Sequence, residues 1–189
     1  AWRSGASKWC MFDYGSQMGT TYIHTGIVDY FRIPKRAYYW YRNTYAKVAP
    51  PTWPTSGTPA ALKLTASTTA LTAVDGTQDA WLLVTVVDAS GKALSNTVTV
   101  TLAVTSGPGE FPTGPSITFT PGTGTAANDI AILDGQAAID FRTYYSGTSV
   151  ITASSPGLTS ATVTITSQGS PAYVEGQTPP ADTRPYTGQ

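Results

Sequence analysis

The segment between Pro34 and the pair Pro50-Pro51 places the strongest limit on how this chain can fold. Aromatic and apolar side chains recur in it at steps of three and four residues, which puts them on one face of a helix. They are Ala37, Trp40, Tyr41, Thr44, Tyr45 and Val48. Pro34 is tolerated at the first helical position, and the proline pair ends the helix. Because a helix with three large aromatic side chains on one face is not stable alone, we expect it to cover a large apolar surface.

The residues before this helix predict the other half of a strand–helix unit. Residues 7–14 are mostly apolar, as in a parallel strand covered on both faces. A long loop separates this strand from the helix. Residues 1–48 therefore predict a single βα unit, which is a part of a domain rather than a domain.

The pattern changes after a proline-rich linker at residues 49–59, in which we expect Trp53 to pack against one neighbour. Over residues 60–167, short segments rich in Val, Ile and Thr alternate with turns such as Asp75-Gly76 and Asp134-Gly135. About seven strands at this spacing predict an antiparallel immunoglobulin-like β-sandwich, with one solvated face on each sheet. The tail, residues 168–189, has no period, and we expect an extended strap or a mobile end there.

The charge balance excludes some classes of partner. Charged residues make up only 12% of the 189 residues, and the formal net charge is +0. This argues against nucleic acid, which a basic surface would attract, and gives no reason to expect a membrane partner. No apolar run reaches the roughly 20 residues of a spanning helix. The first residues contain neither an initiator Met nor a signal-peptide core, so we expect a processed or truncated product. The abundance of Gly, Pro, Thr and Ser is typical of secreted all-β modules, and we expect a periplasmic or secreted location.

The residues of this chain contain no convincing catalytic set. Cys10 is the single cysteine, which excludes an internal disulfide and a metal site with several Cys ligands. His24 is the single histidine, and no nucleophile is paired with it in the sequence. No phosphate-binding loop or metal-ligand cluster is present, and no two carboxylates are spaced to converge on one group. We therefore expect no cofactor and no bound metal.

Three residues stay open as site candidates. Asp13 ends the apolar strand, which is where a parallel α/β sheet places functional residues. Asp29 precedes the helix, where bonding to the backbone or to Arg32 is the simpler interpretation. The ring of Trp9 is either a platform for the C–H face of a sugar or part of an ordinary core. Three other aspartates lie in tight turns, where a side-chain cap is the simplest role; they are Asp75, Asp88 and Asp134.

Two segments resemble the end of the catalytic barrel in glycoside hydrolase family two, which includes β-galactosidases, β-glucuronidases and β-mannosidases. Residues 9–16 look like the eighth barrel strand. Residues 26–42 resemble the entry into the last barrel helix; matching positions are Gly26, Val28-Asp29, Arg32, Pro34-Lys35 and Ala37-Tyr38-Tyr39. The later β pattern resembles bacterial immunoglobulin-like modules of invasin type, which follow the barrel in many such enzymes. The implied fold is mainly β: an immunoglobulin-like sandwich preceded by the final βα unit of a (β/α)8 barrel.

The resemblance implies that this chain is the C-terminal part of a retaining β-glycosidase similar to β-galactosidases. The family's two catalytic glutamates, about 5–5.5 Å apart, would both lie upstream of Ala1. Trp9 would form the floor of the sugar pocket, and Asp13 with residues 16–25 would form its rim. The peptide bond after Trp9 is expected in cis, which costs about 3–4 kcal/mol and so signals a functional constraint. The implied partners are an upstream catalytic polypeptide or segment and a β-glycoside or oligosaccharide substrate; homo-oligomerisation stays open.

A second hypothesis, of a different class, is a non-catalytic adhesion or carbohydrate-binding module. The sandwich pattern supports it, whereas the aromatic helix does not. Glycan binding by isolated residues 60–167 would separate the two hypotheses.

Overall fold

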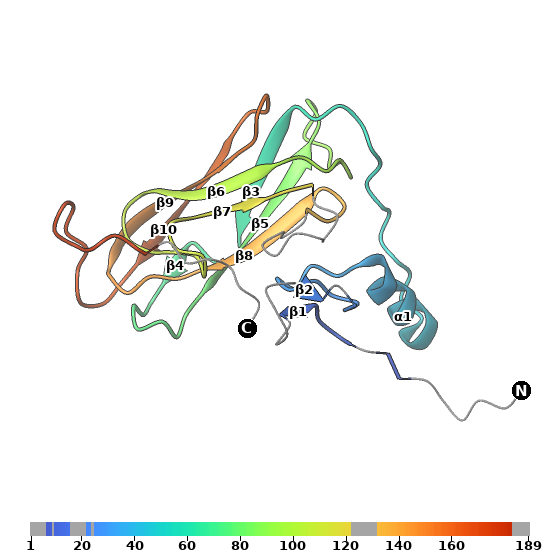
Figure 1. Cartoon of the computed structure of the whole chain (residues 1–189), viewed down its shortest axis with the longest axis horizontal. Helices are drawn as coiled ribbons and strands as arrows, with labels where there is room; N and C mark the ends of the chain where they lie inside the picture. Colours follow the sequence, from blue (N-terminus) through green and yellow to red (C-terminus); the bar gives the residue numbers. More distant parts are fainter. Residues whose placement is uncertain (1–6, 9, 16–21, 24, 122–131, 183–189) are drawn as a thin grey trace, which may run out of the picture.

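The computed structural model describes residues 7–8, 10–15, 22–23, 25–121 and 132–182. Two β-sheets packed face to face make up most of it, and a short N-terminal segment with a helix lies beside them (Figure 1). The helix, α1, spans Arg36–Ala46. The strands are β1 (Tyr14–Gly15), β2 (Tyr22–Ile23), β3 (Ala61–Ala66), β4 (Ala70–Leu71), β5 (Ala80–Val87), β6 (Val100–Ser106), β7 (Ser116–Phe119), β8 (Gln136–Phe141), β9 (Gly147–Ser154) and β10 (Ala161–Ser167).

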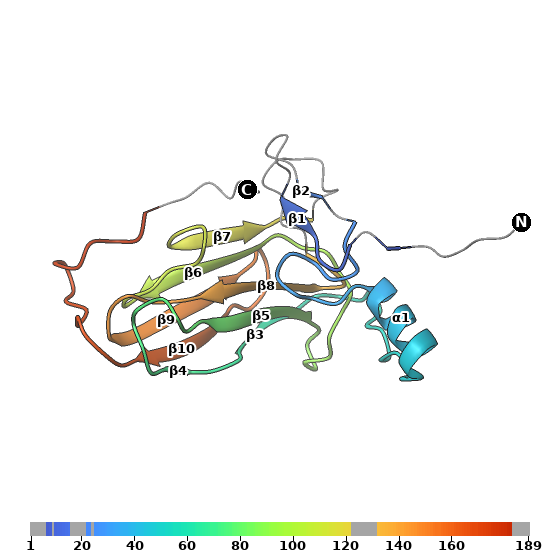
Figure 2. The ribbon, with the colours of Figure 1, turned by 90° about the horizontal axis from the view of Figure 1, so that it is seen from below.

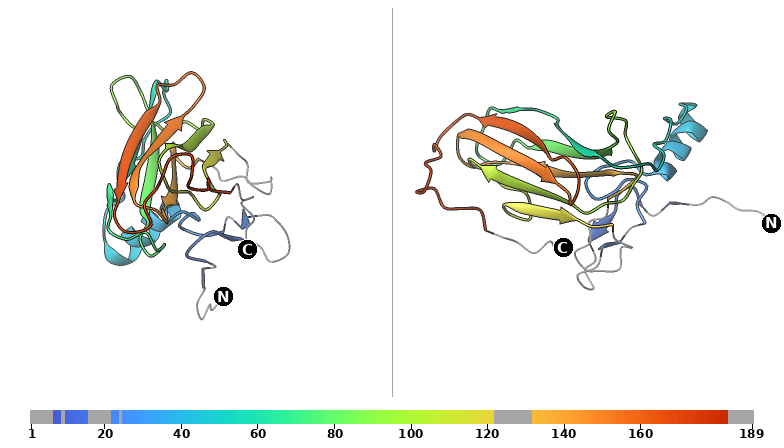
Figure 3. Two further views of the ribbon diagram at one scale, coloured as in Figure 1. Left: turned by 90° about the vertical axis from the view of Figure 1, so that its left-hand side faces the viewer. Right: turned by 90° about the horizontal axis from the view of Figure 1, so that it is seen from above.

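The sandwich consists of a five-stranded and a three-stranded sheet, which Figure 3 shows as two layers. The strand order is β4-β10-β9-β6-β7 in the first sheet and β3-β5-β8 in the second. Neighbouring strands are antiparallel, except that β4 runs parallel to β10. The mainly β fold and the antiparallel immunoglobulin-like sandwich predicted from the period-two pattern are thereby confirmed.

Alternation along the strands places the core between the sheets. On β5, Leu82, Val84 and Val86 point inward and are fully buried. They pack in one apolar cluster with side chains of the five-stranded sheet, among them Leu102 and Ile151. Because successive side chains of a strand point to opposite faces, this period is what specifies the register.

The N-terminal segment covers part of the outer face of the three-stranded sheet. Phe31 and Ile33 are buried and belong to the same apolar cluster as the sandwich core. Trp81, on the outer side of β5, donates a hydrogen bond of 2.8 Å from Nε1 to the carbonyl of Phe31. The expected solvated face holds for the five-stranded sheet, where alternate residues of β10 are exposed and those of β9 are exposed or half-buried. The prediction of a solvated outer face is wrong for the part of the three-stranded sheet around Trp81 and Leu83. These two side chains form an apolar surface, which is more stable when it is covered.

The predicted strand over residues 7–14 is wrong in its extent. Among the described residues of that range, Phe12 forms one parallel bridge with Val28, and Tyr14 begins β1, which pairs with β2. The remaining described residues there are not in a strand. A strand persists only where neighbouring backbone groups complete its hydrogen bonds, and here the neighbour is the short segment 27–28.

The predicted helix forms, but it begins at Arg36 rather than at Pro34. Pro34 instead pairs with Val28 in an antiparallel bridge, so the helix starts after it. At the other end Lys47 adopts the left-handed conformation, and its N–H donates to the carbonyl of Asn43 at 3.1 Å. No residue of α1 is buried in this structure. Figure 2 shows the helix projecting away from the sandwich.

Trp53 of the linker packs against two residues of α1, where the sequence predicted one neighbour. The Trp53 ring makes an edge contact with Tyr39, with ring centroids 5.1 Å apart, and lies 5.2 Å below the Arg36 guanidinium. The aromatic stripe of the helix, by contrast, has little cover within the described part of the chain. Trp40 and Tyr45 both contact the ring of Tyr41, but they remain 61% and 76% exposed.

Candidate functional site

The predicted site lies where residues 11–13 run beside residues 27–28. Met11 accepts a hydrogen bond from the N–H of Val28 at 2.9 Å, and Val28 accepts one from Asp13 at 2.9 Å. Gly26 lies so close to this pairing that a Cβ there would overlap the backbone of Phe12 and Asp13. The glycine that opens the motif of residues 26–42 is therefore required by backbone packing.

Asp13 joins the two ends of this segment. Its side chain is buried, and Oδ1 accepts hydrogen bonds from the N–H of Gly26 at 2.9 Å and from Lys35 Nζ at 2.6 Å. Lys35 is the residue that immediately precedes α1. A buried carboxylate is stable when paired and hydrogen-bonded in this way. These contacts fix the start of the helix relative to the strand-like segment, and the substrate contact of Asp13 stays a prediction.

Asp29 follows the paired residues and closes a tight turn. Its Oδ1 accepts a hydrogen bond of 2.6 Å from the N–H of Ile33, and its carbonyl accepts one of 3.1 Å from the N–H of Arg32. Burial raises the pKa of Asp29 to about 6, with a further upward contribution from Asp13, although the hydrogen bond from Ile33 opposes the shift. The sequence interpretation of Asp29 as a backbone-bonding residue is consistent with this geometry.

Several predicted features lie outside the described residues. They are Trp9, the bond between Trp9 and Cys10, His24, and residues 16–21 of the expected pocket rim. Cys10 itself is half-buried, and its Sγ lies 2.7 Å from the carbonyl oxygen of Phe12. Trp9 as a sugar platform therefore stays a prediction.

A second ion pair ties the helix to the sandwich. Arg36 Nη2 lies 2.9 Å from Asp134 Oδ1, and Arg36 Nε lies 3.2 Å from Asp134 Oδ2, so the pair is bidentate. Asp134 and Gly135 both have positive φ, at 47° and 74°, in the turn before β8. The sequence predicted this turn, but no local signal indicated its partner 98 residues earlier.

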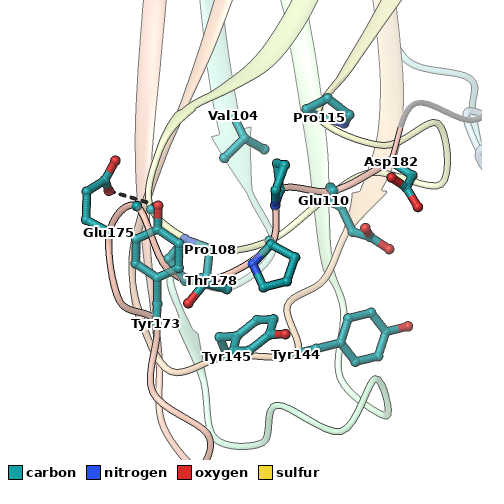
Figure 4. Close-up of a pocket in the computed structure, with 16 residues that line it drawn as sticks. Val104, Pro108, Glu110, Pro115, Tyr144, Tyr145, Tyr173, Glu175, Thr178 and Asp182 are labelled. Atoms are coloured by element: carbon teal, nitrogen blue, oxygen red, sulfur yellow. Dashed lines mark hydrogen bonds between the residues drawn. The ribbon is translucent and has the colours of Figure 1, made fainter.

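A groove at the other end of the sandwich was not anticipated from the sequence. It lies between the C-terminal strap, residues 171–182, and the loops that follow β6 and β8 (Figure 4). Its volume is about 620 Å³. Three tyrosines and three carboxylates contribute to its lining: Tyr144, Tyr145, Tyr173, Glu110, Glu175 and Asp182.

Within the ranges that the structure describes, no three His, Cys, Asp or Glu side chains gather as metal ligands would. The helix in these ranges is too short and too polar to cross a bilayer.

Comparison with known proteins gives matches by structure alone, since no family model and no curated protein matches the sequence. A glycosyl hydrolase family 2 member from Bacteroides cellulosilyticus is 19% identical, with a TM-score of 0.48, over 60% of this chain and 15% of its own. A β-glucuronidase from glycoside hydrolase family 2 is 26% identical, with a TM-score of 0.47, over 71% of this chain and 15% of its own. The D00-D0 domain of intimin is 18% identical, with a TM-score of 0.43, over 60% of this chain and 50% of its own. The chain thus spans about one-seventh of the length of each of the two glycosidase structures.

Proposed function

We propose that this chain is the C-terminal part of a retaining β-glycosidase similar to β-galactosidases, in which residues 1–48 complete the catalytic barrel and the sandwich follows. The exposed aromatic stripe of α1 carries the proposal. Trp40 and Tyr45 remain 61% and 76% exposed, although burial of a large apolar side chain is worth about 1.5–3 kcal/mol. A neighbouring pair of barrel helices is the surface that such a stripe would cover.

The arrangement around Asp13 supports the same proposal. The Phe12–Val28 bridge is parallel, and Asp13 contacts the residue that precedes α1. In a (β/α)8 barrel, functional side chains lie at the carboxyl ends of the strands, just before the loops that lead into the helices. Asp13 occupies the corresponding position in the proposed last βα unit.

In the proposed enzyme the catalytic acid/base and nucleophile are glutamates of an upstream segment or of a second polypeptide. Trp9 contributes the floor of the sugar pocket and Asp13 part of its rim. Lys35 acts on the site through Asp13, because its ammonium group holds that carboxylate in place. The sandwich orients the last barrel helix through the Arg36–Asp134 ion pair and the Trp81–Phe31 hydrogen bond. We also propose a periplasmic or secreted location.

The test is the intact mass of the native material, together with its hydrolysis of nitrophenyl β-galactoside, β-glucuronide and β-mannoside. We expect a mass several times 19.8 kDa, or a larger co-purifying chain, and hydrolysis that first releases the β-anomer. Trp9→Ala should lower kcat/KM, whereas Trp53→Phe, in the linker, should not. A monomer of 19.8 kDa with a folded N-terminal segment and no hydrolysis of any of the three substrates would contradict the proposal.

A further inference from the structure

We propose that the groove beneath the C-terminal strap binds a neutral oligosaccharide. Its volume of about 620 Å³ lies within the roughly 300–1,000 Å³ of small-molecule sites. This proposal stands on residues of the sandwich and the strap, and it does not depend on the glycosidase assignment.

The sandwich fixes one wall of the groove. The backbone of Tyr145 is held by Thr143, whose Oγ1 donates to the Tyr145 carbonyl at 2.8 Å and accepts from the Tyr145 N–H at 3.1 Å. Ser167 Oγ donates to the same carbonyl at 2.9 Å. Thr143 and Ser167 are both buried. The peptide that carries the Tyr145 ring is therefore pre-organised, which lowers the entropy lost on binding.

The strap forms the second wall, and it is bound to the sandwich. The N–H of Tyr173 donates to the carbonyl of Ser146 at 2.8 Å, and the N–H of Ser146 donates to Pro171 at 2.9 Å. Beyond this pairing the strap turns, with the N–H of Thr178 donating to the carbonyl of Val174 at 2.9 Å. The side chain of Thr178 closes the turn, because its Oγ1 accepts from the N–H of Val174 at 2.9 Å.

The loop after β6 forms the third side of the groove. Gly109 has a φ of 107°, and a Cβ there would overlap the ring of Phe141. Glycine thus lets the loop lie directly on the core. The next residue, Glu110, exchanges two backbone hydrogen bonds with Arg142, at 2.8 and 3.1 Å. Its carboxylate extends toward the groove beside Asp182 (Figure 4).

The lining matches the two kinds of surface that a sugar ring presents. Tyrosine rings can pack against the C–H face of a pyranose, and carboxylates accept hydrogen bonds from its hydroxyl groups. Within the protein, the carboxylate of Glu175 already accepts a hydrogen bond of 2.8 Å from a hydroxyl group, that of Tyr173. Among the described lining residues there is no Lys, Arg or His. This excess of carboxylates would repel a uronic acid or a phosphate.

The placement of the rings favours an extended saccharide over a small organic cation. Figure 4 shows Tyr173, Tyr145 and Tyr144 one after another along one side of the groove. A cation site of the aromatic-cage type needs rings on several sides of one point. A row of rings instead suits successive sugars of a linear chain.

The test is calorimetric titration of the full chain with cellotetraose and with β-1,4-galactotetraose. We expect at least one of them to bind, and tetragalacturonate to bind at least tenfold more weakly. Tyr145→Ala should weaken binding of the tetrasaccharide about tenfold or more, whereas Tyr145→Phe, which keeps the ring, should stay within about threefold. Tyr144→Ala provides a second variant, because that side chain is exposed and its removal leaves the core intact.

Two controls keep the result specific to this groove. Val174→Ala changes an exposed residue of the same strap outside the lining, and Trp9→Ala changes the pocket of the proposed glycosidase. Neither should alter the titration, so loss of binding in Trp9→Ala would assign the sugar to the other pocket and overturn this proposal. The proposal also fails if neither tetrasaccharide binds, if both Tyr144→Ala and Tyr145→Ala bind normally, or if choline binds in place of the saccharides.

Discussion

The indole N–H of Trp81 donates a hydrogen bond of 2.8 Å to the carbonyl of Phe31, a residue 50 positions earlier in the chain. Trp81 is on the outer side of β5, and Phe31 lies in the loop just before α1. This bond therefore connects the sandwich to the segment that carries the aromatic helix. Together with the Arg36–Asp134 ion pair, it fixes that segment at two points.

The first prediction concerns this bond. Trp81→Phe keeps an aromatic ring over the sheet but removes the donor, which leaves the partly buried Phe31 carbonyl without this partner. We expect the free energy of unfolding to fall by about 1–2 kcal/mol, measured by urea denaturation followed by circular dichroism. Tyr45→Phe, at an exposed helix position, is the control and should leave stability unchanged. Equal stability of all three proteins would show that the bond contributes nothing.

The second prediction follows from the raised pKa of Asp29. Its folded-state pKa of about 6 lies above the ordinary value of 3.8, so between these pH values the folded chain holds a proton that the unfolded chain releases. Stability should therefore fall as pH rises from 4 to 6 and level off above that range, by at most about 3 kcal/mol. Asp29→Asn keeps an oxygen to accept from Ile33 and should abolish this part of the slope.

The comparison of the two pH profiles separates the contribution of Asp29 to the pH dependence of stability from the contributions of other titratable groups. Burial also raises the pKa of Asp140, which adds a slope of the same sign. Hydrogen bonds lower the pKa values of Asp75 and Asp88, which adds a slope of the opposite sign near pH 4, and Asp29→Asn leaves all three contributions in place. Urea unfolding at pH 4, 5, 6 and 7 provides both profiles. If the substituted and unsubstituted chains lose stability in parallel, the assignment to Asp29 is wrong.

The third prediction uses two glycines that share a conformation but differ in surroundings. Gly135 and Gly91 have φ values of 74° and 82°. A Cβ on Gly135 would overlap the carbonyl of Leu94, whereas a Cβ on Gly91 would meet nothing within 4 Å. Gly91→Ala should therefore cost about 1–2 kcal/mol for the left-handed backbone alone. Gly135→Ala should cost clearly more, as measured by thermal unfolding, and similar losses would argue against the close approach.

The fourth prediction contrasts an exposed and a buried apolar side chain. Trp40→Ser should change the stability of this chain by less than about 0.5 kcal/mol, because the indole has little cover here. Leu82→Ala, in the fully buried core, should cost about 2–5 kcal/mol. Chemical denaturation of the two variants provides the measurement. A large loss in Trp40→Ser would mean that the aromatic stripe already packs within this polypeptide.

The sandwich could be predicted from the sequence because its signals are local. Period-two alternation marks most of the longer strands, and paired turn residues such as Asp134-Gly135 mark the turns between strands. The side-chain caps of Asp75 and Asp88 were likewise predictable, and both accept hydrogen bonds from residues within four positions. In contrast, β4 has only two residues, which is too short for any period to be recognised.

The parts that could not be predicted depend on contacts between distant residues. Whether residues 7–14 form a strand depends on neighbours that the segment itself does not specify. The partners of Arg36 and Trp81 lie 98 and 50 positions away, with no pattern linking them. The groove was missed because the tail has no period, although its order comes from backbone pairing with Ser146. The Asp13–Lys35 contact lay within the recognised motifs, but spacing alone did not indicate it.

The parallel pairing of β4 with β10 has a mechanical consequence. The N–H of Thr166 donates to the carbonyl of Thr69 and that of Gln168 to the carbonyl of Leu71, each at 2.9 Å, so the second and the last strand of the sandwich lie side by side and run in the same direction. A pulling force applied to the linker at one end and to the tail at the other would act on β4 and β10 as shear. All hydrogen bonds between these two strands would then bear the force at the same time. The module would therefore resist extension best along the line that joins its two attachment points.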